Sequence, residues 1–132
     1  MHIWTLENWK YNFTNIQSRR SGLRFRFTPD VNTEVRGACL KFGKWLRKEY
    51  FFPIRVPVYV KGKKHIKAMD GEMVYGTFFQ PYNKTYEPYI RVATGSYTDN
   101  SITLGRDDAL ALILETIAHE LTHYFQWIND IR

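Results

Sequence analysis

The sequence predicts an α+β fold in which one helix precedes a small, mostly antiparallel sheet and a second helix follows it. Apolar residues recur at three-to-four spacing over residues 30–50 and again over residues 107–128. Between these stretches the apolar residues alternate with a period of two, which is typical of strands. A length of 132 residues suits one domain with one hydrophobic core, so we treat residues 1–132 as a single unit.

Composition excludes several classes of protein. With 44% hydrophobic residues the chain is too apolar for a disordered protein. The longest aliphatic run, residues 109–114, is far shorter than the roughly 20 residues that cross a bilayer. The N-terminus lacks the basic and then apolar order of a secretory signal, and a lone cysteine cannot form an internal disulfide. We therefore expect a soluble, cytoplasmic protein with no membrane span.

Charge is distributed unevenly along the chain. Residues 1–67 carry 15 Lys and Arg against 4 Asp and Glu, a net charge of +11. Residues 68–132 carry 4 against 9, a net charge of −5, and the whole chain is at +6. This asymmetry indicates an anionic partner or two faces of opposite potential, although a solvated basic surface explains it equally simply.

The first part of the chain predicts an arm followed by a helix. Residues 1–27 are basic and aromatic, and the alternation over residues 23–27 indicates a short strand or an extended arm. Thr28-Pro29-Asp30 has the hydroxyl, proline and acid that open helices, so we expect one amphipathic helix over residues 30–50. Cys39 falls near its apolar stripe and is expected in the core.

The middle of the chain predicts strands. We expect them at residues 55–60, 65–69, 72–80 and 88–94. Asp70-Gly71 is a strong signal for a two-residue hairpin turn between the second and the third. Residues 98–105 are expected to form a loop. Asp107-Asp108 then favours the start of the last helix, because acidic side chains stabilise the positive end of the helix dipole, and this helix should run to about Ile128.

The last predicted helix contains the spacing of a metal site, His119-Glu120-Leu121-Thr122-His123. Residues four apart lie one turn apart on one helix face, so both imidazoles can reach one Zn²⁺. Glu120 is then placed beside the metal, where its carboxylate can take a proton from a bound water.

The two histidines also lie away from the apolar stripe of this helix. Its members are Leu110, Ile113, Leu114, Ile117, Leu121, Tyr124, Phe125 and Ile128. His119 and His123 fall beside Thr116 and Gln126 instead, so they are not expected to be core histidines. A surface pair of histidines that binds no metal is the alternative.

Residues 115–126 resemble the active helix of zincin metallopeptidases, including the SprT-like and ImmA/IrrE-type groups, and the helix–sheet–helix order is similar to the minimal zincin core. The resemblance implies Zn²⁺ held by His119 and His123, with Glu120 as the general base that activates a zinc-bound water. It also implies a sheet strand beside the site that receives the substrate backbone. Residues 89–95 are the candidate, with an ordinary strand as the alternative.

A catalytic zinc site takes three protein ligands, and the third is not evident. The metzincin pattern requires Gly at position 126 and His or Asp at position 129, but the chain has Gln126 and Asn129. Other zincins take the third ligand well after the motif, and only nine residues follow His123. We therefore expect the ligand to lie beyond residue 132, in a natural protein that continues past this point.

Within the chain two side chains are alternatives for that ligand. Asp130 lies on the correct helix face, but an unbroken helix would place it about 10 Å further along the axis, so only a break after Trp127 could bring it to the metal. His65 on the predicted hairpin is the other alternative, although an exposed turn histidine is the simpler interpretation. His2 is a weaker candidate still.

The first functional hypothesis is a zinc-dependent metalloendopeptidase that hydrolyses peptide bonds in a protein or peptide substrate. An oxyanion-stabilising Tyr, His or Arg is expected, but the sequence does not select one. The alternative is a catalytically incomplete zincin scaffold that binds nucleic acid through its basic half. The residues for it are Arg19, Arg20, Arg24, Arg26 and the turn at residues 61–67, interleaved with Tyr11, Phe13, Phe25 and Phe27.

These hypotheses can also merge. SprT-like peptidases act on proteins held on DNA, so the basic half would anchor the nucleic acid and the acidic half would carry the catalytic face. The ImmA-type resemblance implies a third case, a mobile-element protease that cleaves a regulator. The sequence leaves the substrate and the oligomeric state open.

Overall fold

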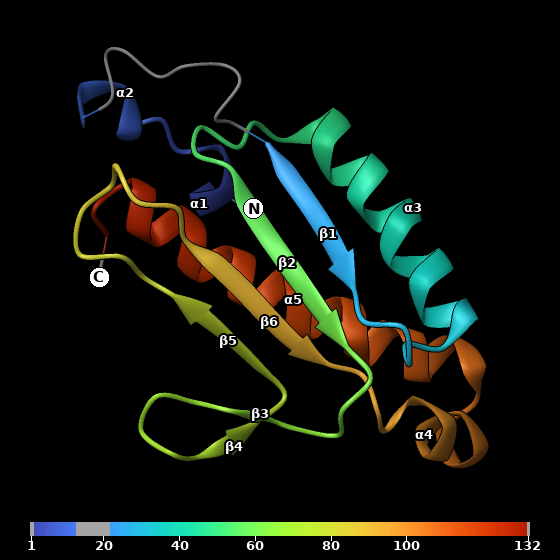
Figure 1. Ribbon diagram of the computed structural model, residues 1–132. Coiled ribbons are helices and arrows are strands. Elements are labelled where there is room, and N and C mark those ends of the chain that lie inside the picture. The colour runs from blue at the N-terminus through green and yellow to red at the C-terminus, as the bar shows by residue number, and fades with distance from the viewer. Residues whose placement is uncertain (1, 13–21, 132) are drawn as a thin grey trace.

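The computed structural model describes residues 2–12 and 22–131 (Figure 1). Its helices are α1 (His2–Thr5), α2 (Trp9–Asn12), α3 (Thr33–Glu49), α4 (Tyr97–Leu104) and α5 (Arg106–Ile128). Its strands are β1 (Leu23–Phe27), β2 (Val56–Lys61), β3 (Ile66–Lys67), β4 (Met73–Val74), β5 (Gly76–Phe79) and β6 (Tyr89–Ala93). The predicted α+β class is confirmed.

The main sheet is mixed rather than mostly antiparallel, which corrects the expectation from the sequence. Its order is β1-β2-β6-β5, with β1, β2 and β6 parallel and only β5 antiparallel. The physical reason is the connection between β1 and β2, which runs through α3. Such a crossover joins parallel strands, whereas a tight turn joins antiparallel ones. Part of the predicted N-terminal arm, Leu23–Phe27, is therefore an edge strand of this sheet.

A small hairpin stands beside the main sheet. β3 and β4 pair antiparallel around the predicted Asp70-Gly71 turn, where Gly71 has φ of 89°. Glycine adopts this conformation without the steric cost that a Cβ atom brings. The single strand predicted over residues 72–80 is in fact two strands separated at Tyr75, so β4 pairs with β3 while β5 pairs with β6.

The helices cover one face of the sheet and leave the other open (Figure 1). α3 packs on β1 and on α5, α5 packs on β5 and β6, and α1 and α4 pack on α5. The fully buried side chains between these layers include Val35, Leu46, Val56, Val58, Val60, Ile90, Val92, Ile117, Leu121 and Tyr124. Cys39 is buried among them, as predicted. Within the described residues no helix is long and apolar enough to cross a membrane.

The start of α3 differs from the expectation at Thr28-Pro29-Asp30. The N-cap is Asn32, whose side-chain oxygen accepts a hydrogen bond of 2.8 Å from the Glu34 amide. Thr28 Oγ1 instead accepts a hydrogen bond of 3.1 Å from the Gly62 amide, just after β2. The hydroxyl thus joins the ends of two neighbouring strands, a long-range contact that competes with capping.

The loop predicted over residues 98–105 is also wrong, because this segment is the helix α4. Its hydroxyl and amide side chains are typical of loops, but Tyr97 at its start is buried and the helix packs on α5. Gly105, with φ of 90°, then separates α4 from α5. Tertiary packing has overridden a weak local preference here.

Candidate metal centre

The 23-residue helix α5 carries the histidine pair and is fixed on both sides by polar contacts. Tyr124, fully buried, donates a hydrogen bond to the Ile54 carbonyl and accepts one of 3.1 Å from the Ile54 amide. On another face Trp4 Nε1 donates to Thr122 Oγ1 at 3.0 Å. These contacts hold the helix segment from Glu120 to Tyr124 in one orientation.

His119 and His123 are exposed, which confirms the prediction that they lie outside the apolar stripe. Their Nε2 atoms are 3.3 Å apart and their rings are nearly perpendicular, at 88°. Two nitrogens bound about 2.05 Å from one tetrahedral Zn²⁺ would be about 3.3–3.4 Å apart. The pair therefore has the nitrogen spacing of two zinc ligands. A hydrogen bond between two neutral imidazoles has a similar length.

Gln126 contacts the ring nitrogen of His123 that faces away from His119. Gln126 Oε1 is 3.1 Å from His123 Nδ1. If Nδ1–H donates to this oxygen, Nε2 keeps its lone pair, which is the tautomer that a metal needs. The contact is thus of the kind that orients a ligating histidine.

Glu120 lies on the inner side of the pair and is only 7% exposed. Burial raises the pKa of its carboxyl group, and the neighbouring His119 and His123 partly oppose that shift. The side chain rests against β5, where Gly76 leaves room for it. A Cβ atom at position 76 would be 2.8 Å from Thr116 Cγ2 and 3.2 Å from Glu120 Oε2.

A cleft of about 570 Å³ opens beside Glu120. Tyr75 and Gly76 line one side, α4 contributes Tyr97 and Asn100, and α5 contributes Thr116, His119 and Glu120. His119 and Glu120, the two lining residues whose side chains can exchange protons, therefore border a space large enough for part of a peptide substrate. α4, which the sequence did not predict, forms a wall of this cleft.

The strand beside the site is β5 and not the predicted segment at residues 89–95. That segment contains β6, which pairs with β2 on one side and with β5 on the other. Both of its edges are therefore already hydrogen-bonded, so it cannot accept a further strand. In the described part of the chain no strand pairs with the outer edge of β5.

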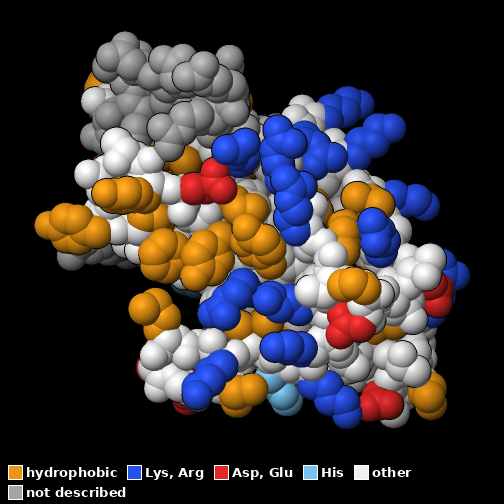
Figure 2. Space-filling view, in the orientation of Figure 1, with side chains coloured by type: hydrophobic (Ala, Val, Ile, Leu, Met, Phe, Trp, Pro, Cys, Tyr) orange, Lys and Arg blue, Asp and Glu red, His pale blue; other side chains and the backbone are white. Residues whose placement is uncertain are grey.

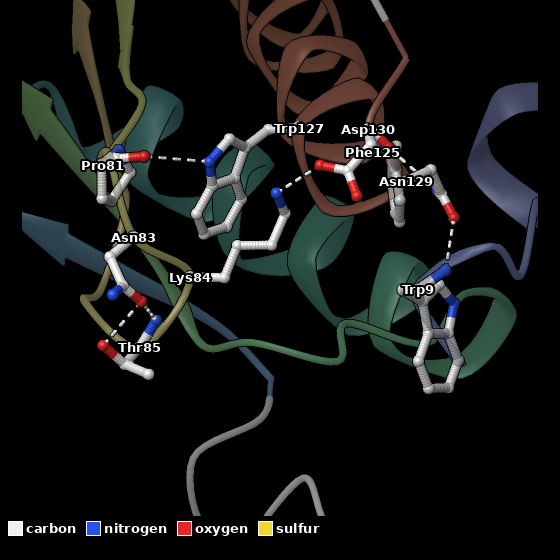
Figure 3. Close-up of polar contacts among 9 residues, drawn as sticks. All are labelled: Trp9, Pro81, Asn83, Lys84, Thr85, Phe125, Trp127, Asn129 and Asp130. Atoms are coloured by element: carbon white, nitrogen blue, oxygen red, sulfur yellow. Dashed lines mark hydrogen bonds and ion pairs between the residues drawn. The ribbon is translucent and has the colours of Figure 1, made fainter. Parts of the chain in front are cut away.

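The structure does not bring Asp130 to the histidine pair. α5 continues unbroken through Ile128, and the Asp130 carboxylate instead forms an ion pair of 2.5 Å with Lys84 (Figure 3). The end of the helix is fixed by two further hydrogen bonds: Trp127 Nε1 donates to the Pro81 carbonyl at 3.1 Å, and the Trp9 amide donates to Asn129 Oδ1 at 3.0 Å (Figure 3). The helix break that an Asp130 ligand requires is absent.

His65 does not join the pair either. Its ring packs against Tyr75, with centroids 5.2 Å apart. Across residues 2–12 and 22–131, no group of three His, Cys, Asp or Glu side chains is placed to hold one metal ion. The side chain of His2 is outside the described part of the structure. The described residues thus supply a two-histidine site with an adjacent carboxylate.

The basic and aromatic residues proposed for nucleic acid divide between two faces. Arg24 and Arg26 are exposed on the open face of the sheet, whereas Phe25 and Phe27 pack toward the core. Arg36 lies over the Phe27 ring at 4.9 Å. Phe13, Arg19 and Arg20 lie outside the described residues. Phe25 and Phe27 therefore lie on the opposite face of the sheet from Arg24 and Arg26.

Sequence reasoning missed Gly76 as a residue that shapes the site. The available signal was an isolated glycine inside a predicted strand, which marks a bulge or a close approach of another backbone or side chain. Comparison of the chain with models of protein families, with curated proteins and with solved structures finds no match.

Proposed function

We propose that the protein is a zinc-dependent metallopeptidase that hydrolyses peptide bonds. One observation carries the proposal: two exposed imidazole nitrogens lie 3.3 Å apart, with the buried carboxylate of Glu120 between them in sequence and a cleft beside it. A histidine pair without a metal would require neither that carboxylate nor the cleft. The spacing, the burial and the cleft together favour metal-assisted hydrolysis.

His119 and His123 would hold the metal, and Gln126 would keep His123 in the ligating tautomer. When bound, Zn²⁺ would supply Lewis acidity, lowering the pKa of a coordinated water toward about 7 and polarising a substrate carbonyl. The described residues provide two ligands, and residues 13–21 contain no His, Cys, Asp or Glu. A residue beyond position 132, as expected from the sequence, or a donor from water, the substrate or a partner would complete the coordination.

Glu120 is the proposed general base and proton shuttle. Its carboxylate would take a proton from the attacking water and later give one to the departing amine, since such transfers need one group with a pKa near neutrality. Burial moves the pKa of Glu120 in that direction. The neighbouring His119 and His123 oppose this shift.

The outer edge of β5 is the proposed position of the substrate backbone. An extended peptide can add to an exposed sheet edge through main-chain hydrogen bonds. β5 begins at Gly76, directly against Glu120, so a peptide on this edge would pass the proposed base. The cleft next to it would take side chains of the substrate.

The test compares Glu120→Gln with the matched control Glu115→Gln in the zinc-supplemented chain, with unfolded casein as substrate. Glu115 is exposed, lies on the same helix and lines the same cleft. We expect Glu120→Gln to lower the rate by about 10²–10⁴-fold and Glu115→Gln to leave it nearly unchanged. Zinc content and thermal midpoint should be retained in both. Undiminished proteolysis by Glu120→Gln would reject the proposal.

A further inference from the structure

The open face of the main sheet carries arginine and aromatic side chains instead of a second layer of helices. The helices that pack on the sheet, α3 and α5, lie on its other side, and α5 passes behind the strands in Figure 1. Figure 2 views the open face and shows a band of hydrophobic side chains with Lys and Arg on both sides of it. A sheet face without a covering layer is normally polar, so the exposed rings call for an explanation.

The strand register determines which side chains share this face. Arg26 is paired with Tyr59, Tyr59 with Arg91, and Arg91 with Thr77, which forms one row across four strands. Residues paired in this way point to the same side of a sheet. Arg24 on β1 lies two residues from Arg26 and therefore belongs to the same face.

Three rings form a continuous surface in the middle of this face. Phe79 and Tyr89 are stacked, with centroids 4.9 Å apart and an angle of 21° between their planes. Tyr59 meets Tyr89 edge to face at 6.0 Å. Tyr59 lies on the inner strand β2, and its side chain is nevertheless 40% exposed. The arrangement offers flat apolar faces that a planar ligand could cover.

A pocket of about 360 Å³ adjoins these rings where the β3–β4 hairpin approaches the sheet. Phe79 and Tyr89 line it together with Thr77, Arg91 and Met69. Thr77 Oγ1 and Arg91 Nε are buried there and lack a hydrogen-bond partner among the described residues. The guanidinium of Arg91 also donates from Nη2 to the Lys67 carbonyl at 3.2 Å. Buried polar atoms are normally paired, so Thr77 Oγ1 and Arg91 Nε represent hydrogen-bonding capacity that no described residue uses.

The charges on this face favour an anion. Arg24 and Arg26 are exposed and form no ion pair with any described residue. Of the nearby acids, Glu87 is paired with Arg55 at 2.9 Å. Asp70 lines the pocket and accepts a hydrogen bond of 3.0 Å from the Glu72 amide. The arginines are thus available for phosphates.

We infer that the open sheet face binds single-stranded nucleic acid. Bases stack on Tyr59, Tyr89 and Phe79, and phosphates contact Arg24 and Arg26. One base enters the pocket, where Thr77 and Arg91 meet its polar edge. A duplex would not fit this surface, because its bases are stacked on each other and cannot cover the rings. The inference is independent of the proposed peptidase activity.

The first experiment measures fluorescence anisotropy with labelled oligothymidylate and oligouridylate of about 15 nucleotides. It compares Arg24→Ala/Arg26→Ala with Lys41→Ala/Lys44→Ala, which removes the same charge from exposed positions of α3. Only the arginine variant should lose affinity strongly, and its log–log salt slope should fall by about 1.4. Equal losses of affinity in both variants would show that binding depends only on net charge and not on this face of the sheet, and would overturn the inference.

The second experiment compares Tyr59→Ala with Tyr59→Phe by the same titration. Loss of the ring should weaken binding by at least about fivefold, since one stacked base contributes that much, whereas phenylalanine should retain the affinity. A duplex of the same length should compete poorly. The inference is wrong if Tyr59→Ala binds normally, if the duplex competes equally, or if vesicles with anionic lipid displace the oligonucleotide while unlabelled single strands do not.

Discussion

The backbone of Gly76 lies so close to the carboxylate of Glu120 that a Cβ atom at position 76 would be 3.2 Å from Oε2. The same atom would be 2.8 Å from Thr116 Cγ2, a distance that real Cβ atoms do not show. β5 and α5 therefore meet at a point where one of them must lack a side chain. This contact buries Glu120 and sets the position of the proposed base.

Gly76→Ala is expected to destabilise the protein by about 1–3 kcal/mol, because the added methyl group forces apart β5 and α5. Urea unfolding would measure the change in the free energy of unfolding. Gly37→Ala is the matched control: Gly37 is exposed in the second turn of α3, and a Cβ atom there meets nothing within 4 Å. That substitution should stabilise the helix by about 0.5–1 kcal/mol. Equal effects at both positions would contradict the close approach at Gly76.

Tyr124→Phe should cost about 1–3 kcal/mol of stability, because both backbone groups of the partly buried Ile54 would lose their hydrogen-bond partner. Tyr82 is fully exposed, so Tyr82→Phe provides the control and should change stability by less than about 0.5 kcal/mol. Thermal or urea unfolding of the three chains distinguishes these outcomes. A neutral Tyr124→Phe would mean that α5 is not held through Ile54.

The Cys39 thiol should be unreactive in the folded chain. It is fully buried, and burial raises its pKa from 9.0 to about 12. As the pH rises, the Cys39 thiol deprotonates in the unfolded chain before it does so in the folded chain. Its contribution to stability is therefore complete below pH 9 and is lost as the pH rises toward 12. A chromogenic disulfide reagent at about pH 8 should label no thiol in native protein and one per chain in urea. Rapid native labelling would contradict the burial.

The helices α3 and α5 and most strands could be predicted from the sequence, because each depends on a periodic pattern within its own residues. The strand order could not, since pairing joins segments such as Leu23–Phe27 and Val56–Lys61 that are distant in the chain. Predictions from neighbouring residues also failed where a side chain makes its main contact with a part of the chain far away in sequence. Thr28 bonds the Gly62 amide rather than capping α3, and α4 forms because Tyr97 is buried.

The candidate site shows the same division. The spacing of His119, Glu120 and His123 within one helix was sufficient to place them on one side of it. The neighbouring strand was not predictable, because only the assembled sheet makes β5 an edge and β6 an inner strand. Alternation within β1 places Arg24 and Arg26 on the face opposite Phe25, but nothing local showed that they share their face with Tyr59 on β2.

Gln126→Ala should weaken zinc binding by about tenfold, because His123 would lose the group that fixes its tautomer. Asp130→Asn should leave the affinity unchanged, since Asp130 is paired with Lys84 and lies beyond the end of α5. Asparagine also tolerates the φ of 55° found at this position. Competition with a fluorescent zinc chelator measures both affinities. A large loss in Asp130→Asn would restore Asp130 as a ligand.

The central claim is that His119 and His123 bind one zinc ion together, and the most direct test is the zinc content of the purified chain after dialysis against zinc and then buffer. We predict one zinc per chain in the unaltered protein and in Glu120→Gln, and almost none in His119→Ala or His123→Ala. All four chains should retain the same thermal midpoint in the absence of metal. Equal zinc content in the histidine variants and the unaltered chain, or none in any of them, would contradict the account.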